Sequence, residues 1–101
     1  MTPEKRIQNE ILKYLKKLKD NDEPIFYERR QAGGFSYKKG IPDIYVVYNG
    51  IHIEIEVKAE KGEPSPLQEK FEKMCNKCNI LYLRTKSLEE VKNLINTLKD
   101  I

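Results

Sequence analysis

The apolar positions of the first segment recur at helical spacing and predict a helix near the start of the chain. Thr2 suits the N-cap of this helix, and Pro3 suits its first helical position. We expect the helix to end near Lys19, before a polar segment that leads to Pro24. Its inward stripe consists of Ile7, Ile11, Tyr14, Leu15 and Leu18.

Three apolar runs after this helix predict three strands. The first strand covers Ile25–Arg30 and precedes a loop that contains several glycines. The next two strands, Asp43–Tyr48 and Ile51–Lys58, are separated only by Asn49-Gly50. Asn-Gly between apolar runs is the strongest local signal of a β-hairpin, because a type I′ turn needs positive φ at both central residues.

The rest of the chain predicts a helix, a strand and a helix. The first of these helices covers Ser65–Lys77 and begins with a capping box that includes Gln68. A short strand over Asn79–Arg84 follows, and then an amphipathic helix over Ser87–Lys99 that is capped by its first residue and by Glu90. The order helix, three strands, helix, strand, helix predicts an α/β fold with a mixed sheet flanked by helices.

The two-residue turn fixes how the hairpin strands pair. One face of the hairpin is then wholly apolar and consists of Ile44, Val46, Tyr48, Ile51, Ile53, Ile55 and Val57. The other face places Asp43 opposite Glu56, with Lys58 beyond them. Carboxylates ~5 Å apart repel by roughly 3 kcal/mol at an effective dielectric of about 20. The pair therefore indicates a cation or a shared proton between the two carboxylates, and divalent cations such as Mg²⁺ take oxygen ligands of this kind.

The same residues also have purely structural interpretations. Glu54, Glu56 and Lys58 are typical of the solvated outer face of an antiparallel strand. Asp43 can simply begin a strand after Pro42, and the capping box accounts for Gln68. These alternatives stay open at the level of the sequence.

The first helix offers a further carboxylate. Glu4 falls near the centre of the inward stripe, whereas Glu10 lies near its edge. Glutamate is almost never buried without a partner, so Glu4 at the helix end is a candidate for a metal site at the edge of the sheet. A glutamate in the first turn also compensates the helix dipole, and both interpretations remain open.

Composition agrees with a folded domain that extends over residues 1–101. The chain is 39% hydrophobic and 35% charged, and no stretch approaches the roughly 20 consecutive apolar residues of a membrane span. The first residues lack the layout of a signal peptide, so we expect an intracellular protein.

The net charge of +3 is less informative than its distribution. One basic cluster lies on the first helix and consists of Lys13, Lys16, Lys17 and Lys19. A second flanks the glycine-containing loop and consists of Arg29, Arg30, Lys38 and Lys39. Basic residues placed in this way can neutralise phosphates, although a solvated helix face explains the first cluster equally well.

The two cysteines, Cys75 and Cys78, do not predict a zinc site, because four ligands are needed and His52 is the only histidine of the chain. They share a helical stripe with Leu67, Phe71 and Met74. This pattern favours two buried thiols.

The string Gly40-Ile41-Pro42-Asp43, followed by a hairpin and by Glu56-Val57-Lys58, resembles the PD-(D/E)XK nuclease signature. The chain is similar over nearly its whole length to the stand-alone VRR-NUC (virus-type replication-repair nuclease) family. The other matching positions are the acidic Glu4, the basic Arg29-Arg30, Lys39, Gly62, and Ser65 to Gln68. A bare Glu-x-Lys is a weak signal, whereas this ordered set with this spacing is specific.

This resemblance implies a restriction-endonuclease-like PD-(D/E)XK core and metal-dependent hydrolysis of phosphodiester bonds in DNA. It implies that Asp43 and Glu56 bind Mg²⁺ or Mn²⁺ together with the backbone carbonyl of Val57. It implies that Lys58 positions or activates the attacking water and stabilises charge on the phosphate.

The resemblance extends to further residues and to partners. Glu4 would complete the acidic set, with Glu10 in reserve, and Gln68 would orient water or a site residue. A homodimer that cuts branched DNA, Holliday junctions above all, is also implied, in an intracellular enzyme of bacterial or phage origin. We expect the loop Gln31–Lys39 and the basic residues that flank it to contact the DNA backbone.

Two alternatives remain at this stage. One is a nuclease that acts on flaps, single-stranded DNA or RNA, because site residues report the reaction and not the shape of the substrate. The other is a non-catalytic DNA-binding module with the nuclease fold. Such a module would be expected to lose Asp43, Glu56 or Lys58, and the sequence keeps all three.

Overall fold

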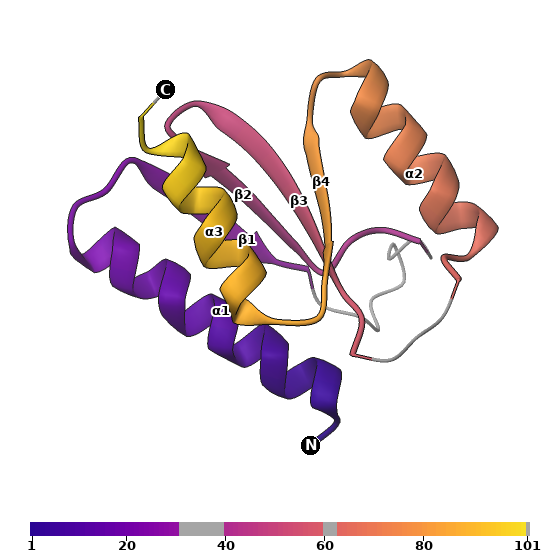
Figure 1. Ribbon diagram of the computed structural model, residues 1–101, viewed down its shortest axis with the longest axis horizontal. Helices are drawn as coiled ribbons and strands as arrows, with labels where there is room; N and C mark the ends of the chain where they lie inside the picture. Colours follow the sequence, from indigo (N-terminus) through magenta and orange to yellow (C-terminus); the bar gives the residue numbers. More distant parts are fainter. Residues whose placement is uncertain (31–39, 60–62, 101) are drawn as a thin grey trace.

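The computed structural model describes residues 1–30, 40–59 and 63–100 (Figure 1). Along the chain these residues form α1 (Pro3–Asp20), β1 (Ile25–Arg29), β2 (Ile44–Tyr48), β3 (Ile51–Val57), α2 (Pro66–Lys77), β4 (Leu81–Thr85) and α3 (Leu88–Leu98). The predicted order of elements is confirmed. The predicted loop over Gln31–Lys39 lies outside the described residues.

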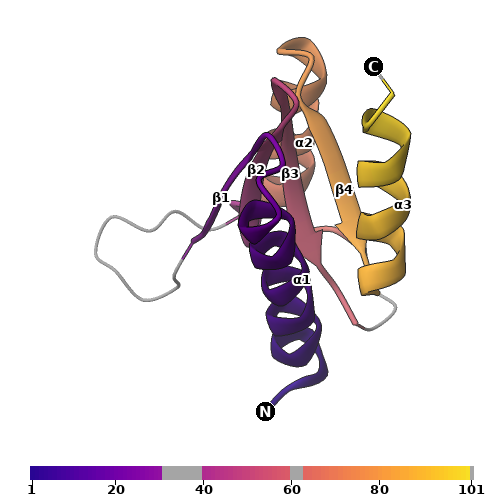
Figure 2. The same cartoon turned by 90° about the vertical axis from the view of Figure 1, so that its left-hand side faces the viewer.

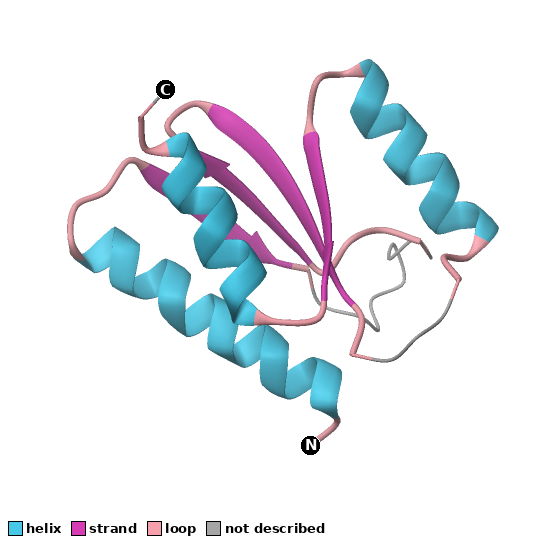
Figure 3. Ribbon diagram, in the orientation of Figure 1, coloured by secondary structure: helices cyan, strands magenta, loops and turns pink. Residues whose placement is uncertain are grey.

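The strands form a mixed sheet in the order β1-β2-β3-β4. The first two pairings are antiparallel, and β3 pairs with β4 in parallel. A parallel pair needs a crossover connection, and α2 provides it. In Figure 2, α1 and α3 lie near one another beside the sheet, and Figure 3 shows α2 set apart from both of them, next to β4.

The hydrophobic core lies between α1, α3 and one face of the sheet. In the predicted stripe of α1, Tyr14 is half-buried and the four aliphatic residues are buried, and from α3 the core takes Val91, Ile95 and Leu98. The sheet contributes the apolar face of the hairpin, and its buried members are Ile44, Val46, Tyr48, Ile53, Ile55 and Val57. The opposite face of the sheet is therefore available for polar side chains. None of the described helices is long and apolar enough to cross a membrane.

The predicted hairpin register is confirmed. Asn49 and Gly50 have φ values of 52° and 80°, the left-handed conformation that a type I′ turn requires. Tyr48 pairs with Ile51, and the pairing continues to Ile44 and Ile55. The ladder between β2 and β3 ends there. Each strand is one residue shorter at the open end than the predicted Asp43–Tyr48 and Ile51–Lys58.

The first two helices begin with the predicted caps. The Thr2 hydroxyl accepts a hydrogen bond of 3.1 Å from the backbone N–H of Lys5. In α2, the Gln68 N–H donates to Ser65 Oγ over 3.2 Å, and the Ser65 N–H donates to Gln68 Oε1 over 2.9 Å. The predicted capping box is confirmed.

The prediction for the cap of α3 is only partly right. Ser87 occupies the N-cap, but its side chain makes no capping hydrogen bond. Glu90 Oε1 instead accepts from the Lys86 N–H over 3.1 Å and from the Thr85 hydroxyl over 3.0 Å. The Glu90 side chain therefore secures the end of β4 rather than the N–H of Ser87.

The prediction of two buried thiols is wrong for one of them. Cys75 is buried, whereas Cys78 is exposed. Cys78 occupies the C-cap of α2, and Asn79 follows with a φ of 59°, so the helical period no longer describes position 78. Leu67 and Met74 are 50% and 51% exposed, so the apolar stripe of α2 is only partly covered.

Candidate functional site

The central strand β3 carries two buried carboxylates on the face away from the core. Glu54 and Glu56 are only 1% and 6% exposed, so the interpretation of these glutamates as a solvated outer face is wrong. Burying a carboxylate costs several kcal/mol unless a counter-charge or hydrogen-bond donors compensate. The partners of each glutamate therefore decide its role.

Glu54 has a full set of partners. Arg30 donates to it twice, from Nη1 to Oε1 over 2.5 Å and from Nη2 to Oε2 over 3.0 Å. The Nε2 atom of His52 lies 2.6 Å from Glu54 Oε2. The Arg30 guanidinium also lies over the ring of Tyr45, 4.9 Å from its centroid. Glu54 is thus neutralised within the protein, and Arg30, which we predicted to contact nucleic acid, has an internal partner.

Glu56 lies two residues further along the same strand and lacks such compensation. Its Oε1 atom accepts one long hydrogen bond of 3.4 Å from Gln68 Nε2. Its Oε2 atom is buried and has no hydrogen-bond partner among the described residues. Burial, and then the negative charge of Asp43, raise the pKa of Glu56 to about 7. The protein itself does little to stabilise this carboxylate in its charged form.

Asp43 lies just before β2, outside the ladder. Its carboxylate oxygen Oδ2 accepts a hydrogen bond of 2.9 Å from the backbone N–H of Val57, and its carbonyl accepts one of 2.8 Å from the N–H of Arg30. The predicted pair of Asp43 with Glu56 lies one position beyond the ladder, which ends at Ile44 and Ile55, and the Asp43 side chain bonds to the backbone of β3. The two carboxylates are still close enough to interact.

The charges around Asp43 come from several elements. Burial is the main cause that raises the pKa of Asp43, and the hydrogen bond from Val57 opposes it. The negative charge of Glu4 raises the pKa further, whereas Lys58 and Arg29 lower it. Glu4 raises the pKa of Glu56 as well, so the start of α1 lies near both carboxylates.

The structure distinguishes the two candidate glutamates of α1. Glu4 is half-buried and acts on both site carboxylates, whereas Glu10 is exposed. Glu4 also lines an open pocket of about 260 Å³, together with Thr2, Pro3 and Ala59. Ala59 follows Lys58 directly, so this pocket adjoins the end of β3. Of the two, Glu4 is the carboxylate placed at the site.

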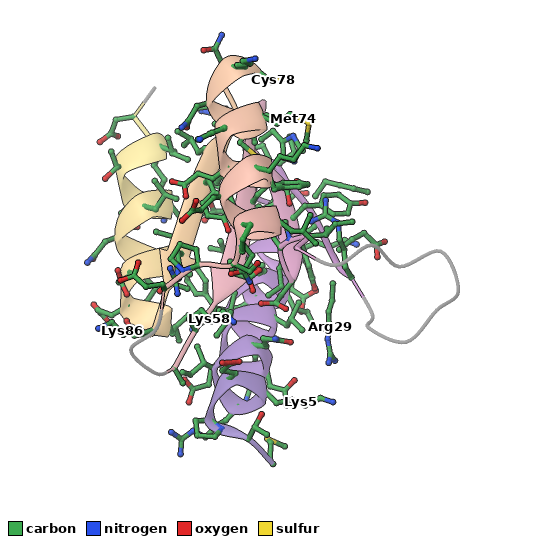
Figure 4. All side chains as sticks on the ribbon, turned by 90° about the vertical axis from the view of Figure 1, so that its right-hand side faces the viewer. Lys5, Arg29, Lys58, Met74, Cys78 and Lys86 are labelled. Carbon is green, nitrogen blue, oxygen red and sulfur yellow. The ribbon has the colours of Figure 1, made fainter. Side chains whose placement is uncertain are left out.

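Lys58 follows the last residue of β3 and is half-buried. Its backbone N–H donates to the Thr85 carbonyl over 2.9 Å, which joins this position to the end of β4. The positive charge of Lys58 lowers the pKa of both Asp43 and Glu56. Figure 4 labels Lys58 and Arg29, which belong to the end of the sheet where β1 and β3 finish.

Sequence reasoning missed Arg84. It is the parallel ladder partner of Glu56 in β4, and its charge lowers the pKa of that carboxylate. The sequence did not indicate that β4 pairs with β3 at this register, because no local turn sets the register of a parallel pair.

Lys38 and Lys39, which were also predicted to bind nucleic acid, lie outside the described residues.

Gly40 lies in the segment before Asp43 and packs closely against the start of α2. Its φ is +84°, and a Cβ atom built there would lie 2.6 Å from Leu67 Cβ and 2.9 Å from the Leu67 carbonyl carbon. Real Cβ atoms do not approach so closely, so both the backbone conformation and the contact require glycine. Gly40 therefore allows the first turn of α2, which carries Gln68, to approach the site.

The donor set fits a hard divalent cation. Such ions take carboxylate and carbonyl oxygens, and Mg²⁺ is often held by one or two carboxylates with water and phosphate. Asp43 and Glu56 offer two carboxylates, and no described residue bonds to the Oε2 atom of Glu56, so this oxygen could serve as a ligand. No group of three or more histidine, cysteine or acidic side chains converges within the described residues. Glu4 adds negative charge near the two carboxylates.

Comparisons with known proteins give one structural match. The chain matches no protein-family model and no curated protein sequence. A solved structure described as "VRR_NUC domain" superposes with a TM-score of 0.72 and 22% sequence identity, over 95% of this chain and 97% of that chain. The likeness inferred from the sequence motifs is thus confirmed at the level of the fold.

Proposed function

We propose that this protein is a metal-dependent nuclease with a PD-(D/E)XK core, which hydrolyses phosphodiester bonds in DNA. The observation that carries the proposal is the contrast between Glu54 and Glu56. Both are buried on the same face of β3, yet Glu54 has Arg30 and His52, whereas one oxygen of Glu56 has no hydrogen-bond partner within residues 1–30, 40–59 and 63–100. An arrangement that destabilises folding in this way is typical of a functional site.

Asp43 and Glu56, with the backbone carbonyl of Val57, are the residues that would hold Mg²⁺ or Mn²⁺. The ion would supply Lewis-acid polarisation of the scissile phosphate and would neutralise its charge. The hydrogen bond from the Val57 N–H fixes the Asp43 carboxylate against β3, so this ligand is oriented before any ion binds.

Lys58 is the residue assigned to the chemical step. Its ammonium group is near both carboxylates, and there it can bind a phosphate oxygen and orient the attacking water. A positive charge at this place stabilises the charge that develops on the phosphate in the transition state. Glu4 adds negative charge that favours the cation, and Gln68 holds the Glu56 carboxylate.

The finer parts of the proposal concern substrate and assembly. Branched DNA as the substrate and a homodimer as the assembly rest on the family resemblance, with flaps, single strands and RNA as alternative substrates. The Arg29 charge at the end of β1 is the described candidate for a DNA contact. Two active sites related by a two-fold axis would suit symmetric cutting of a junction, and closed dimers are the commonest oligomers.

The decisive experiment is a cleavage assay over junctions, flaps, nicked duplex, single strands and RNA, with Mg²⁺, with Mn²⁺ and with chelator. We expect cleavage only with metal, and we expect Asp43→Ala to lose both cleavage and calorimetric Mn²⁺ binding. Asp20→Ala is the matched control, since that carboxylate is exposed at the end of α1. Cleavage that persists in chelator, or metal binding unchanged in Asp43→Ala, would contradict the proposal. Light scattering would test the dimer separately.

A further inference from the structure

Arg30 joins two separate parts of the chain at the polar face of the sheet. Its backbone N–H donates to the Asp43 carbonyl over 2.8 Å. Its Nη1 atom donates to the Pro42 carbonyl over 3.0 Å, and its two terminal nitrogens hold both oxygens of Glu54. One residue thus contacts the segment that carries Asp43 and the strand that carries Glu56.

The position of Asp43 depends on these contacts because regular pairing stops before it. The β1–β2 ladder ends at Arg29 and Ile44, and the β2–β3 ladder ends at Ile44 and Ile55. Pro42, the preceding residue, has no N–H group to donate to a neighbouring strand. The Pro42 carbonyl accepts a hydrogen bond from the Arg30 side chain. This bond fixes the backbone immediately before Asp43.

The Arg30–Glu54 pair is suited to hold a fixed geometry. The Glu54 side chain is 2% exposed and that of Arg30 is 23% exposed, so solvent does little to loosen the pair. A planar guanidinium that meets a carboxylate with two parallel hydrogen bonds has a defined orientation, which a lysine ammonium cannot reproduce. The ring of Tyr45, which lies against the guanidinium, and His52, which contacts Glu54, restrict the two groups further.

We propose that Arg30 is a positioning residue, which acts through Pro42 and Glu54 to set the Asp43 carboxylate against Glu56. This inference rests on the proposed function, because only a site that must hold a cation needs the spacing of those two carboxylates. It assigns Arg30 to the support of the site and leaves phosphate contacts to other basic residues. Supporting residues of this kind typically change metal affinity by 10–100-fold.

The test compares two changes at the Arg30–Glu54 pair with a control at the far end of the sheet. Arg30→Lys keeps the charge but loses the planar fork, and Arg30→Met combined with Glu54→Met removes the pair without leaving an unpaired buried charge. Tyr48→Phe is the control, since it removes a buried hydrogen bond of 2.7 Å to Glu23 at the opposite end of β2.

Three quantities are measured for each variant: the thermal unfolding temperature, the calorimetric affinity for Mn²⁺, and the hydrogen-exchange rate of the Val57 N–H. That amide reports on the Asp43 carboxylate directly, because it donates to Asp43 Oδ2. We expect both variants of the pair to lose at least about tenfold in Mn²⁺ affinity and to speed Val57 exchange at least about tenfold relative to the other β3 amides. Tyr48→Phe should lower the unfolding temperature and change neither of the other two quantities.

The outcomes separate this inference from the proposed function. If the pair variants fold and keep wild-type Mn²⁺ affinity and Val57 protection, Arg30 does not position the site and the inference is overturned. Weaker DNA binding in Arg30→Lys with both quantities unchanged would make it a phosphate contact, which also overturns the inference. If the wild type neither binds Mn²⁺ nor cleaves, the proposed function fails, and Val57 exchange alone then decides whether Arg30 holds Asp43.

Discussion

Gln68 donates its side-chain amide to Glu56 while its own Oε1 atom accepts the backbone N–H of Ser65. The capping interpretation and the site interpretation of Gln68 are therefore not alternatives, because one side chain has both contacts at once. The start of α2 is thereby coupled to a buried carboxylate whose pKa is raised to about 7.

Replacing Gln68 with glutamate should separate the two contacts. A glutamate keeps the capping box, but it removes the donor to Glu56 and places a second negative charge beside it. The pKa of Glu56 should then rise further, and the pH at which cleavage begins should increase by about one unit, equivalent to ~1.4 kcal/mol. Ser65→Ala is the control: it should cost ~1 kcal/mol of stability and leave the pH profile of cleavage unchanged. Identical pH profiles for Gln68→Glu and the wild type would show that the Gln68–Glu56 contact is irrelevant to activity.

Glu56 should make the metal-free protein less stable as the pH rises. Its pKa is raised from 4.5 to about 7, so the folded chain binds this proton more tightly than the unfolded chain. The resulting stabilisation is complete at a pH below 4.5, the pKa of this group in the unfolded chain, and is lost as the pH rises through about 7. Relative to Glu56→Gln, the wild type in chelator should lose up to about 3 kcal/mol of unfolding free energy between these limits.

Chemical denaturation at a series of pH values measures this difference. Saturating Mn²⁺ should restore the lost stability of the wild type at neutral pH and should have no effect on Glu56→Gln. Parallel stability curves for the two proteins would mean that Glu56 ionises normally in the folded state.

Lys58→Ala should abolish turnover while the protein still folds and binds metal. We expect at least about a hundredfold loss of the cleavage rate, or ~2.7 kcal/mol in the barrier. Lys86→Ala is the matched control, because Lys86 is an exposed lysine on the connection between β4 and α3 (Figure 4). Single-turnover cleavage and calorimetry separate the two effects, and equal rates for both variants would remove Lys58 from the chemical step.

Glu4→Gln should reduce cleavage by at least about tenfold, which corresponds to ~1.4 kcal/mol in the barrier. The reason is that Glu4 contributes negative charge near both site carboxylates, and a cation is held less tightly without it. Glu10→Gln, on the exposed side of the same helix, should have a milder effect. Cleavage rates at several Mn²⁺ concentrations provide the comparison, and a reversed ranking would identify Glu10 as the relevant residue.

Gly40→Ala should be more harmful than Gly50→Ala, although both glycines have positive φ. At Gly50 nothing lies within 4 Å of an added Cβ atom, so only the strained backbone counts, at about 1 kcal/mol. At Gly40 the added atom also meets Leu67, which must move together with the first turn of α2. Thermal unfolding and cleavage of both variants should show a larger loss of stability, and a loss of activity, for Gly40→Ala only.

The parts of this fold that local chemistry determines were predictable from the sequence. The Asn49-Gly50 turn determined the register of the hairpin, and with it the division of β3 into an apolar face and an acidic face. The spacing of apolar residues in α1 placed Glu4, and the pattern after Ser65 identified the capping box. In each case the signal that led to the prediction lies within a short stretch of the chain.

The parts that depend on non-local contacts were not predictable in the same way. Arg84 lies beside Glu56 only because β4 pairs in parallel with β3, and no turn between them sets that register. The bond of Arg30 to Glu54 joins residues 24 positions apart, so a basic strand end looked like a surface for phosphates. The position of Asp43 beyond the ladder arises from side-chain hydrogen bonding, which alternation along a strand does not reveal.

The alternation of β3 has a consequence for how this protein can change over evolutionary time. Ile53, Ile55 and Val57 face the hydrophobic core, and the residues between them face the site. Selection for folding and selection for activity therefore act on alternate positions of one strand. A single inserted or deleted residue in β3 would exchange the two sets and damage both properties together, so this strand can diverge by substitution but not by change of length.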